Sequence, residues 1–68
     1  MEIFSDRLKE LRVSFGYTQQ NMAEKLGIKQ QSYTRYETNI GEPSLSTLVS
    51  LCRIFDVSAD YLLGISDV

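Results

Sequence analysis

Six polar side chains between residues 29 and 35 could make specific contacts with another molecule. They are Lys29, Gln30, Gln31, Ser32, Thr34 and Arg35. A glutamine amide can hydrogen-bond both edge atoms of adenine, and arginine or lysine can reach guanine or a phosphate. In a helix, Tyr33 and Tyr36 would point inward and leave the polar side chains on the outer face. A helix of this kind suits the major groove of DNA.

The segment from Thr18 to Tyr36 has the pattern of two short helices joined by a sharp turn. Gly27 stands where the backbone must turn, and Ala23 stands where a second helix must cross closely. Apolar residues at fixed offsets are placed to bury the inner faces, namely Met22, Leu26, Ile28, Tyr33 and Tyr36. This spacing is the sequence signature of a helix-turn-helix motif.

Helical periodicity and capping residues continue through the rest of the chain. They predict an all-α fold of five helices in a single domain that spans residues 1–68. The expected boundaries, in chain order, are residues 3 to 15, an N-cap at Thr18 with a stop at Gly27, Gln30 to Thr38, an N-cap at Ser44, and a start at Ser58 with a stop at Gly64. The inner side of the first helix is expected to carry Ile3, Leu8, Leu11 and Phe15.

The charge of the chain limits the kind of nucleic-acid binding it can support. Its 68 residues have a formal net charge of −2 and a pI near 4.9. Coating nucleic acid without regard to sequence requires many basic residues to neutralise phosphates, so the composition argues against that class of protein. The helix-turn-helix segment has a local charge of about +1, whereas aspartates give the C-terminal end a negative charge. This distribution predicts a weakly basic face with modest affinity in a monomer.

The chain has one cysteine and no histidine, so neither an internal disulfide nor a conventional zinc site can be assembled. Cys52 falls on a helical stripe with Leu45, Leu48, Val49 and Phe55, and it is expected to be a buried core thiol. The charged N-terminal residues leave no room for a signal peptide, and no stretch is apolar enough to cross a bilayer. A cytoplasmic location is therefore expected.

Four segments, in this order and spacing, resemble the lambdoid repressor and Cro-type helix-turn-helix family, also called the XRE family. They are RLKELR at residues 7 to 12, YTQQNMAEKLGI at 17 to 28, QQSYTRYE at 30 to 37 and EPSLSTLVSLCRIFDVSADYLLG at 42 to 64. The resemblance implies a compact lambda-repressor-like DNA-binding domain with its helix-turn-helix at helices two and three. It also implies a sequence-specific transcriptional regulator that binds a pseudo-palindromic double-stranded operator as a homodimer. A repressor of phage, prophage or mobile-element type is the leading expectation.

The same resemblance assigns DNA contacts residue by residue. Gln19 would hold a phosphate and brace Gln30, and Asn39 would bind phosphate from the loop after the third helix. The base-reading residues would be Gln30, Gln31 and Arg35, and the flanking contacts would be Lys29, Ser32 and Thr34. Lys29 occupies a helix N-cap but cannot accept a hydrogen bond there. It is either neutral drift on a solvated turn or a residue retained because it touches DNA.

Two further groups of residues follow from the resemblance. Arg12 and Glu37 would form a buried ion pair that ties the first helix to the end of the third, the alternative being two solvated charges. The family uses helix five and the loop before it for dimer contacts. The corresponding residues, as candidates for an exposed apolar patch, are Val57, Leu62, Leu63 and Ile65. Leu62 and Leu63 could equally complete the core.

Three other classes of function are alternatives to this expectation. An antitoxin or a restriction-modification controller uses the same fold, and nothing in these residues separates it from a repressor. A protein-interaction module would dock a partner at the apolar C-terminal end, and the overall acidity of the chain leaves this alternative open. Ile40 and acidic Glu42 would face the expected phosphates, which predicts a low affinity per half-site. An enzyme is not expected, because there is no histidine, glycine-rich phosphate loop or activated nucleophile. No cofactor, metal or small-molecule ligand is expected.

Overall fold

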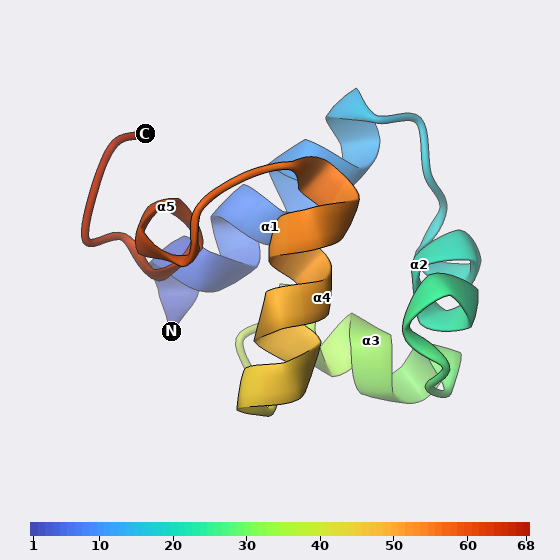
Figure 1. Ribbon diagram of the computed structural model, residues 1–68. Coiled ribbons are helices and arrows are strands. Elements are labelled where there is room, and N and C mark those ends of the chain that lie inside the picture. The colour runs from blue at the N-terminus through green and yellow to red at the C-terminus, as the bar shows by residue number, and fades with distance from the viewer.

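Five helices and no strands make up the computed structural model, which describes residues 1–68. The helices are α1 (Glu2–Ser14), α2 (Gln19–Leu26), α3 (Gln30–Glu37), α4 (Leu45–Phe55) and α5 (Ala59–Leu63). In Figure 1, α4 stands in front of α1, α2 and α3 lie together at the lower right, and α5 packs near the N-terminus. The predicted all-α, five-helix fold is confirmed, with helix ends within one residue of those expected. No helix has the length and apolar character needed to span a membrane.

Side-chain caps fix the starts of α2, α4 and α5. The Thr18 hydroxyl accepts a hydrogen bond from the Asn21 backbone at 3.0 Å, and the Asn21 side chain accepts one from the Thr18 backbone at 2.9 Å. This reciprocal capping box satisfies two donors that the first turn of α2 leaves open. Ser44 and Ser58 cap α4 and α5 by accepting a hydrogen bond from the backbone three residues on. Lys29 precedes α3 without any side-chain cap, as its chemistry predicts.

Two glycines meet different backbone requirements. Gly27 joins α2 to α3 with a φ of +69°, a left-handed backbone conformation that residues with a Cβ rarely adopt. Gly64 ends α5 with a φ of +79°, and a Cβ there would approach the Ile3 side chain to 2.7 Å. Both predicted stops are therefore confirmed, and Gly64 also allows α5 to lie close to α1.

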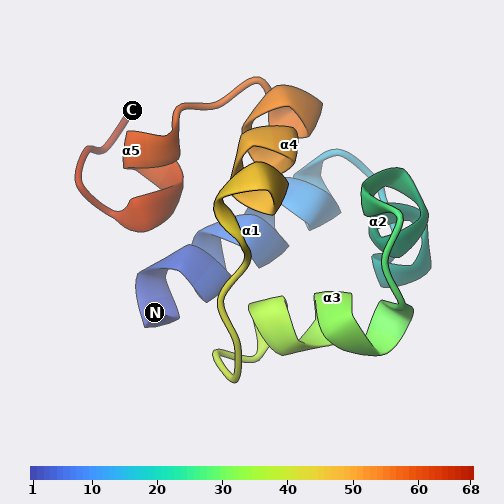
Figure 2. The same cartoon turned by 60° about the horizontal axis from the view of Figure 1, so that its bottom comes forward.

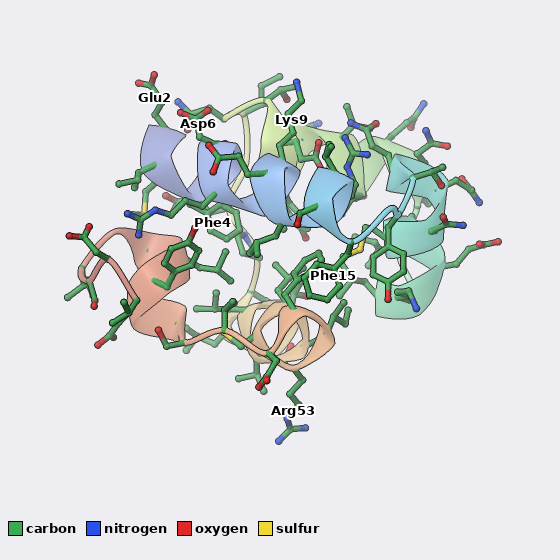
Figure 3. The ribbon with its side chains drawn as sticks, turned by 90° about the horizontal axis from the view of Figure 1, so that it is seen from above. Glu2, Phe4, Asp6, Lys9, Phe15 and Arg53 are labelled. Atoms are coloured by element: carbon green, nitrogen blue, oxygen red, sulfur yellow. The ribbon has the colours of Figure 1, made fainter.

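The core draws on all five helices. Its buried apolar residues are Phe4, Leu8, Met22, Ala23, Tyr33, Leu51, Phe55 and Leu62. Figure 3 shows Phe4 on the side of α1 that faces α4 and α5, whereas Lys9 points away from them. The burial of Met22, Ala23 and Tyr33 fixes α3 against α2 and turns the opposite side of α3 to solvent.

The inner side of α1 differs from the expectation at its two ends. Ile3 is 42% exposed and Phe15 is 46% exposed, whereas the neighbouring Phe4 is buried. Residues 4, 8 and 11 follow one helical stripe, which places Ile3 on its flank. Phe15 remains in edge contact with Phe55, at 5.0 Å between ring centroids, so it covers the rim of the core.

The buried stripe of α4 also differs from the predicted one. Leu45 is 81% exposed, Val49 is 48% exposed, and Cys52 is half-buried, whereas Leu51 is fully buried. The helix carries apolar residues on more than one face, and packing against α2 and α5 selects the stripe through Leu51 and Phe55. Cys52 is thus a free thiol at the edge of the core, where burial raises its pKa.

Candidate nucleic-acid interface

The outer face of α3 is a solvent-exposed row of polar side chains. Gln30, Gln31 and Arg35 are exposed, and Lys29 is exposed just before the helix begins. Tyr33 on the opposite side is fully buried. Figure 2 shows α3 at the lower edge of the molecule, with the other helices all on one side of it. A straight polar helix in this position can enter a major groove without rearrangement of the fold.

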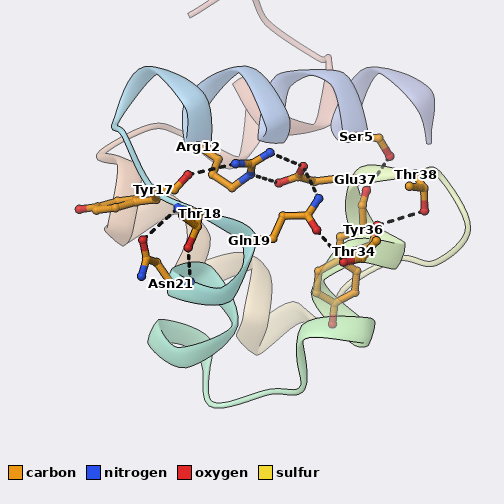
Figure 4. Close-up of polar contacts among 10 residues, drawn as sticks. All are labelled: Ser5, Arg12, Tyr17, Thr18, Gln19, Asn21, Thr34, Tyr36, Glu37 and Thr38. Atoms are coloured by element: carbon orange, nitrogen blue, oxygen red, sulfur yellow. Dashed lines mark hydrogen bonds and ion pairs between the residues drawn. The ribbon is translucent and has the colours of Figure 1, made fainter.

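A buried ion pair ties α3 to α1. The Nε and Nη2 atoms of Arg12 donate to the two carboxylate oxygens of Glu37 at 2.7 and 3.1 Å, a two-pronged geometry (Figure 4). The side chain of Glu37 is 2% exposed and that of Arg12 is 14% exposed. Arg12 also donates to the carbonyl oxygen of Tyr17 at 3.0 Å, ahead of α2. One guanidinium therefore contacts both ends of the helix-turn-helix motif.

The electrostatics of this pair follow from burial and hydrogen bonding. Burial alone would raise the pKa of Glu37, but the hydrogen bonds from Arg12 and Gln19 hold that pKa below its ordinary value. The hydrogen bond to Glu37 raises the pKa of Arg12 in turn. The hydroxyl of Tyr33 is buried without a hydrogen-bond partner, and burial raises the pKa of Tyr33. Glu37 is thus held as a carboxylate between α1, α2 and α3.

Gln19, at the first position of α2, contacts the middle and end of α3. Its Nε2 donates to Glu37 Oε1 at 3.2 Å, and its Oε1 accepts from the Thr34 hydroxyl at 2.8 Å (Figure 4). The expected brace to Gln30 is not present. Gln19 lies opposite the second turn of α3, so it meets Thr34 and Glu37, while Gln30 in the first turn stays in solvent.

The two flanking hydroxyl residues of α3 lie apart from the exposed row. Ser32 and Thr34 are both half-buried. The hydroxyl of Thr34 faces α2 and donates its proton to Gln19, so the structure does not place it as an outward donor. Residue type alone carries no signal of this, because a threonine hydroxyl can bond to protein or to solvent equally well.

Asn39 lies in the loop after α3, at the position expected for a phosphate contact. It is exposed and has a φ of +62°. Its Oδ1 accepts a hydrogen bond from the Met1 ammonium at 2.6 Å, and the same ammonium is 3.7 Å from Glu42 Oε2. The start of α1 is also held to the last turn of α3, because Ser5 donates to the carbonyl oxygen of Tyr36 at 2.7 Å. Sequence reasoning missed this buried serine.

The apolar residues proposed for a dimer patch do not form one surface. Leu62 is fully buried in the core, which removes it from any exposed patch. Val57 and Leu63 are half-buried, and Ile65 is 72% exposed. With five residues, α5 turns a single side inward, and that side is centred on Leu62. Leu63 instead lines a mainly apolar cavity of about 160 Å³ with Leu45 and Pro43.

Comparisons with known proteins agree with this geometry. A family model described as helix-turn-helix matches residues 8–62. The chain is 51% identical over 61 residues to the SPbeta prophage-derived uncharacterized HTH-type transcriptional regulator YonR of Bacillus subtilis, covering 90% of this chain and 56% of YonR. It is likewise 51% identical over 61 residues to the uncharacterized HTH-type transcriptional regulator YqaE of Bacillus subtilis, covering 90% and 53%. The chain thus spans about half the length of these curated relatives.

A solved structure has the same arrangement of helices. The N-terminal DNA binding domain of SinR from Bacillus subtilis superimposes with a TM-score of 0.82, covers 93% of each chain and is 30% identical in sequence. The expectation of a compact DNA-binding-domain fold is confirmed by this match.

Proposed function

This chain belongs to the helix-turn-helix family, and from that premise we propose that it is a sequence-specific regulator of transcription that reads double-stranded DNA with α3. The observation that carries the proposal is the exposed row of Gln30, Gln31 and Arg35 on a helix whose other side is locked to the fold. Paired glutamines suit adenine, and arginine suits guanine or a phosphate. The assignment is supported by the similar proteins, which include two HTH-type transcriptional regulators, one of them prophage-derived.

The proposal includes a division of contacts. The base edges are read by Gln30, Gln31 and Arg35. The DNA backbone is held in register by phosphate contacts from Lys29, Gln19 and Asn39. Asn39 can do so because its Oδ1 is engaged by the Met1 ammonium, which leaves the amide hydrogens as donors. No catalytic step is part of this function.

We further propose that residues 1–68 act as a single DNA-binding domain and that two copies bind a pseudo-palindromic operator. A monomer offers one short reading helix and little basic charge, so a second copy supplies the affinity that one half-site lacks. Two-fold symmetry places the two reading helices about 34 Å apart, which is one turn of DNA. We infer that the protein represses a phage or prophage operon in the cytoplasm.

Selection of bound duplexes from a random DNA pool tests the proposal. The expected outcome is a motif with inverted half-sites centred one turn apart, bound more weakly as salt is raised. A motif without inverted symmetry would contradict the homodimer while keeping the DNA-reading function. No enrichment at low salt by folded protein would contradict DNA reading itself.

A further inference from the structure

Thr34 and Glu37 hold the side-chain amide of Gln19 from two sides. The Thr34 hydroxyl lies 2.8 Å from Gln19 Oε1, and Glu37 Oε1 lies 3.2 Å from Gln19 Nε2. Figure 4 shows the amide between these two groups, with Arg12 on the far side of Glu37. Gln19 is half-buried, so one side of the amide faces the fold.

The direction in which this amide points follows from the chemistry of its neighbours. Glu37 is paired with Arg12 and is a carboxylate, which can only accept hydrogen bonds. It must therefore face the NH₂ end of Gln19, and the oxygen end must face Thr34. Nε2 has two hydrogens, and one remains for a ligand. Gln19 is the first residue of α2, where open backbone N–H groups and the helix dipole favour an anion.

Thr34 cannot serve Gln19 and a DNA phosphate at the same time. A threonine hydroxyl has one hydrogen to donate, and here that hydrogen goes to Gln19 Oε1. A phosphate diester has no hydrogen to give in return, so it cannot bond to the hydroxyl as a donor. Thr34 is also half-buried on the side of α3 that faces α2.

We propose that Thr34 is a positioning residue for DNA binding, which fixes the Gln19 amide so that its free N–H meets a phosphate at the start of α2. This inference rests on the proposed DNA-binding function and replaces the direct contact that the sequence suggested for Thr34. The ion pair of Arg12 and Glu37 orients the NH₂ end of the same amide, so a structural pair and a DNA contact are linked through Gln19.

A double-mutant cycle on the duplex recovered by selection tests the proposal. Thr34→Val removes the hydroxyl while keeping the shape, and it should weaken binding about fivefold, the worth of one ordinary hydrogen bond. Thr34→Ser keeps the donor and should bind within about twofold of wild type. In a Gln19→Ala background, Thr34→Val should have no further effect, because the group it orients is gone. Thr47→Val, on α4, is the matched control and should bind as wild type.

Each other outcome overturns the inference in a recognisable way. If Thr34→Val weakens binding equally in the Gln19→Ala background, Thr34 touches DNA itself. If Thr34→Val lowers the urea midpoint but leaves the affinity of folded protein unchanged, the bond only joins the two helices. If wild type selects no duplex, the proposed function fails and this inference fails with it.

Discussion

Two sets of polar residues on α3 have opposite surroundings, an outer set in solvent and an inner set that contacts α1 and α2. On the outer side, Gln30, Gln31 and Arg35 are exposed, and their side chains make no hydrogen bond within the chain. On the inner side, Thr34 and Glu37 are held by Gln19 and Arg12 through four hydrogen bonds. The difference shows that residue type does not assign a role within this helix. The partners available to each side chain do.

This contrast predicts that stability and binding can be changed separately, except at Thr34, which we propose to position Gln19 for DNA. Substitutions on the inner side should lower the free energy of unfolding, because they leave a buried polar group without its partner. Substitutions on the outer side should lower DNA affinity while the fold remains intact, because nothing in the chain depends on those side chains.

The largest expected effect is on the inner side. Arg12→Ala strands the carboxylate of Glu37, which is 2% exposed, and should lower the free energy of unfolding by about 3–5 kcal/mol. Urea unfolding followed by circular dichroism measures this change. Arg35→Ala removes the same side chain from the outer side and should change stability by less than about 0.5 kcal/mol. Equal unfolding curves for the two variants would contradict a larger contribution of the inner side to stability.

Acid should weaken the same pair without a mutation. The pKa of Glu37 is held below its ordinary value of 4.5, so the unfolded chain binds a proton at a higher pH than the folded chain does. The stabilisation from Glu37 is thus complete above about pH 4.5 and is lost as the pH falls through the folded pKa. Melting temperatures from pH 7 to pH 3 should fall more steeply for wild type than for Glu37→Gln. Parallel curves for wild type and Glu37→Gln would contradict a lowered pKa of Glu37 in the folded chain. Glu24→Gln, at an exposed glutamate, is the control.

On the outer side, Gln30→Ala and Gln31→Ala should each weaken operator binding by about 1–3 kcal/mol. Their stability should stay within about 0.5 kcal/mol of wild type, because both side chains are exposed. Fluorescence anisotropy on the selected duplex and on a scrambled duplex separates lost readout from lost general affinity. Unchanged binding by both variants would refute the assigned readout.

The smallest effect is expected at the start of α3. Lys29 provides no cap, so Lys29→Ser should stabilise the domain by about 0.5–1 kcal/mol. The slope of log affinity against log salt distinguishes the two explanations for this lysine. A slope reduced by about one marks a phosphate contact, and an unchanged slope marks neutral drift. An unfolding curve equal to wild type would show that the cap position is already satisfied by solvent.

Local chemistry made the helix boundaries predictable. Thr18, Ser44 and Ser58 are caps, and Gly27 and Gly64 are stops, because each satisfies or permits a backbone geometry within a few residues. The buried stripes were less predictable, because they depend on which neighbour packs where. On α4 nearly every turn offers an apolar residue, so periodicity did not choose Leu51 over Val49.

The same limit applies to the site. The outer position of Gln30 and Gln31 follows from the spacing of Tyr33 and Tyr36, which is a local pattern. The engagement of Thr34 by Gln19 depends on the angle between α2 and α3, which no spacing in the sequence encodes. The burial of Leu62 likewise depends on how α5 docks against α1, so the sequence left its role open.

The central claim is that the exposed row of α3 is the surface that meets DNA. NMR titration of the labelled protein with the selected duplex tests it most directly, because the side-chain amides of Gln19, Gln30 and Gln31 give separate signals. The account predicts that these signals and the backbone of residues 29 to 35 shift most, while the Asp60 and Ile65 signals on the far side of the domain change little. The largest shifts on α5 and the C-terminal residues, with α3 unchanged, would contradict it.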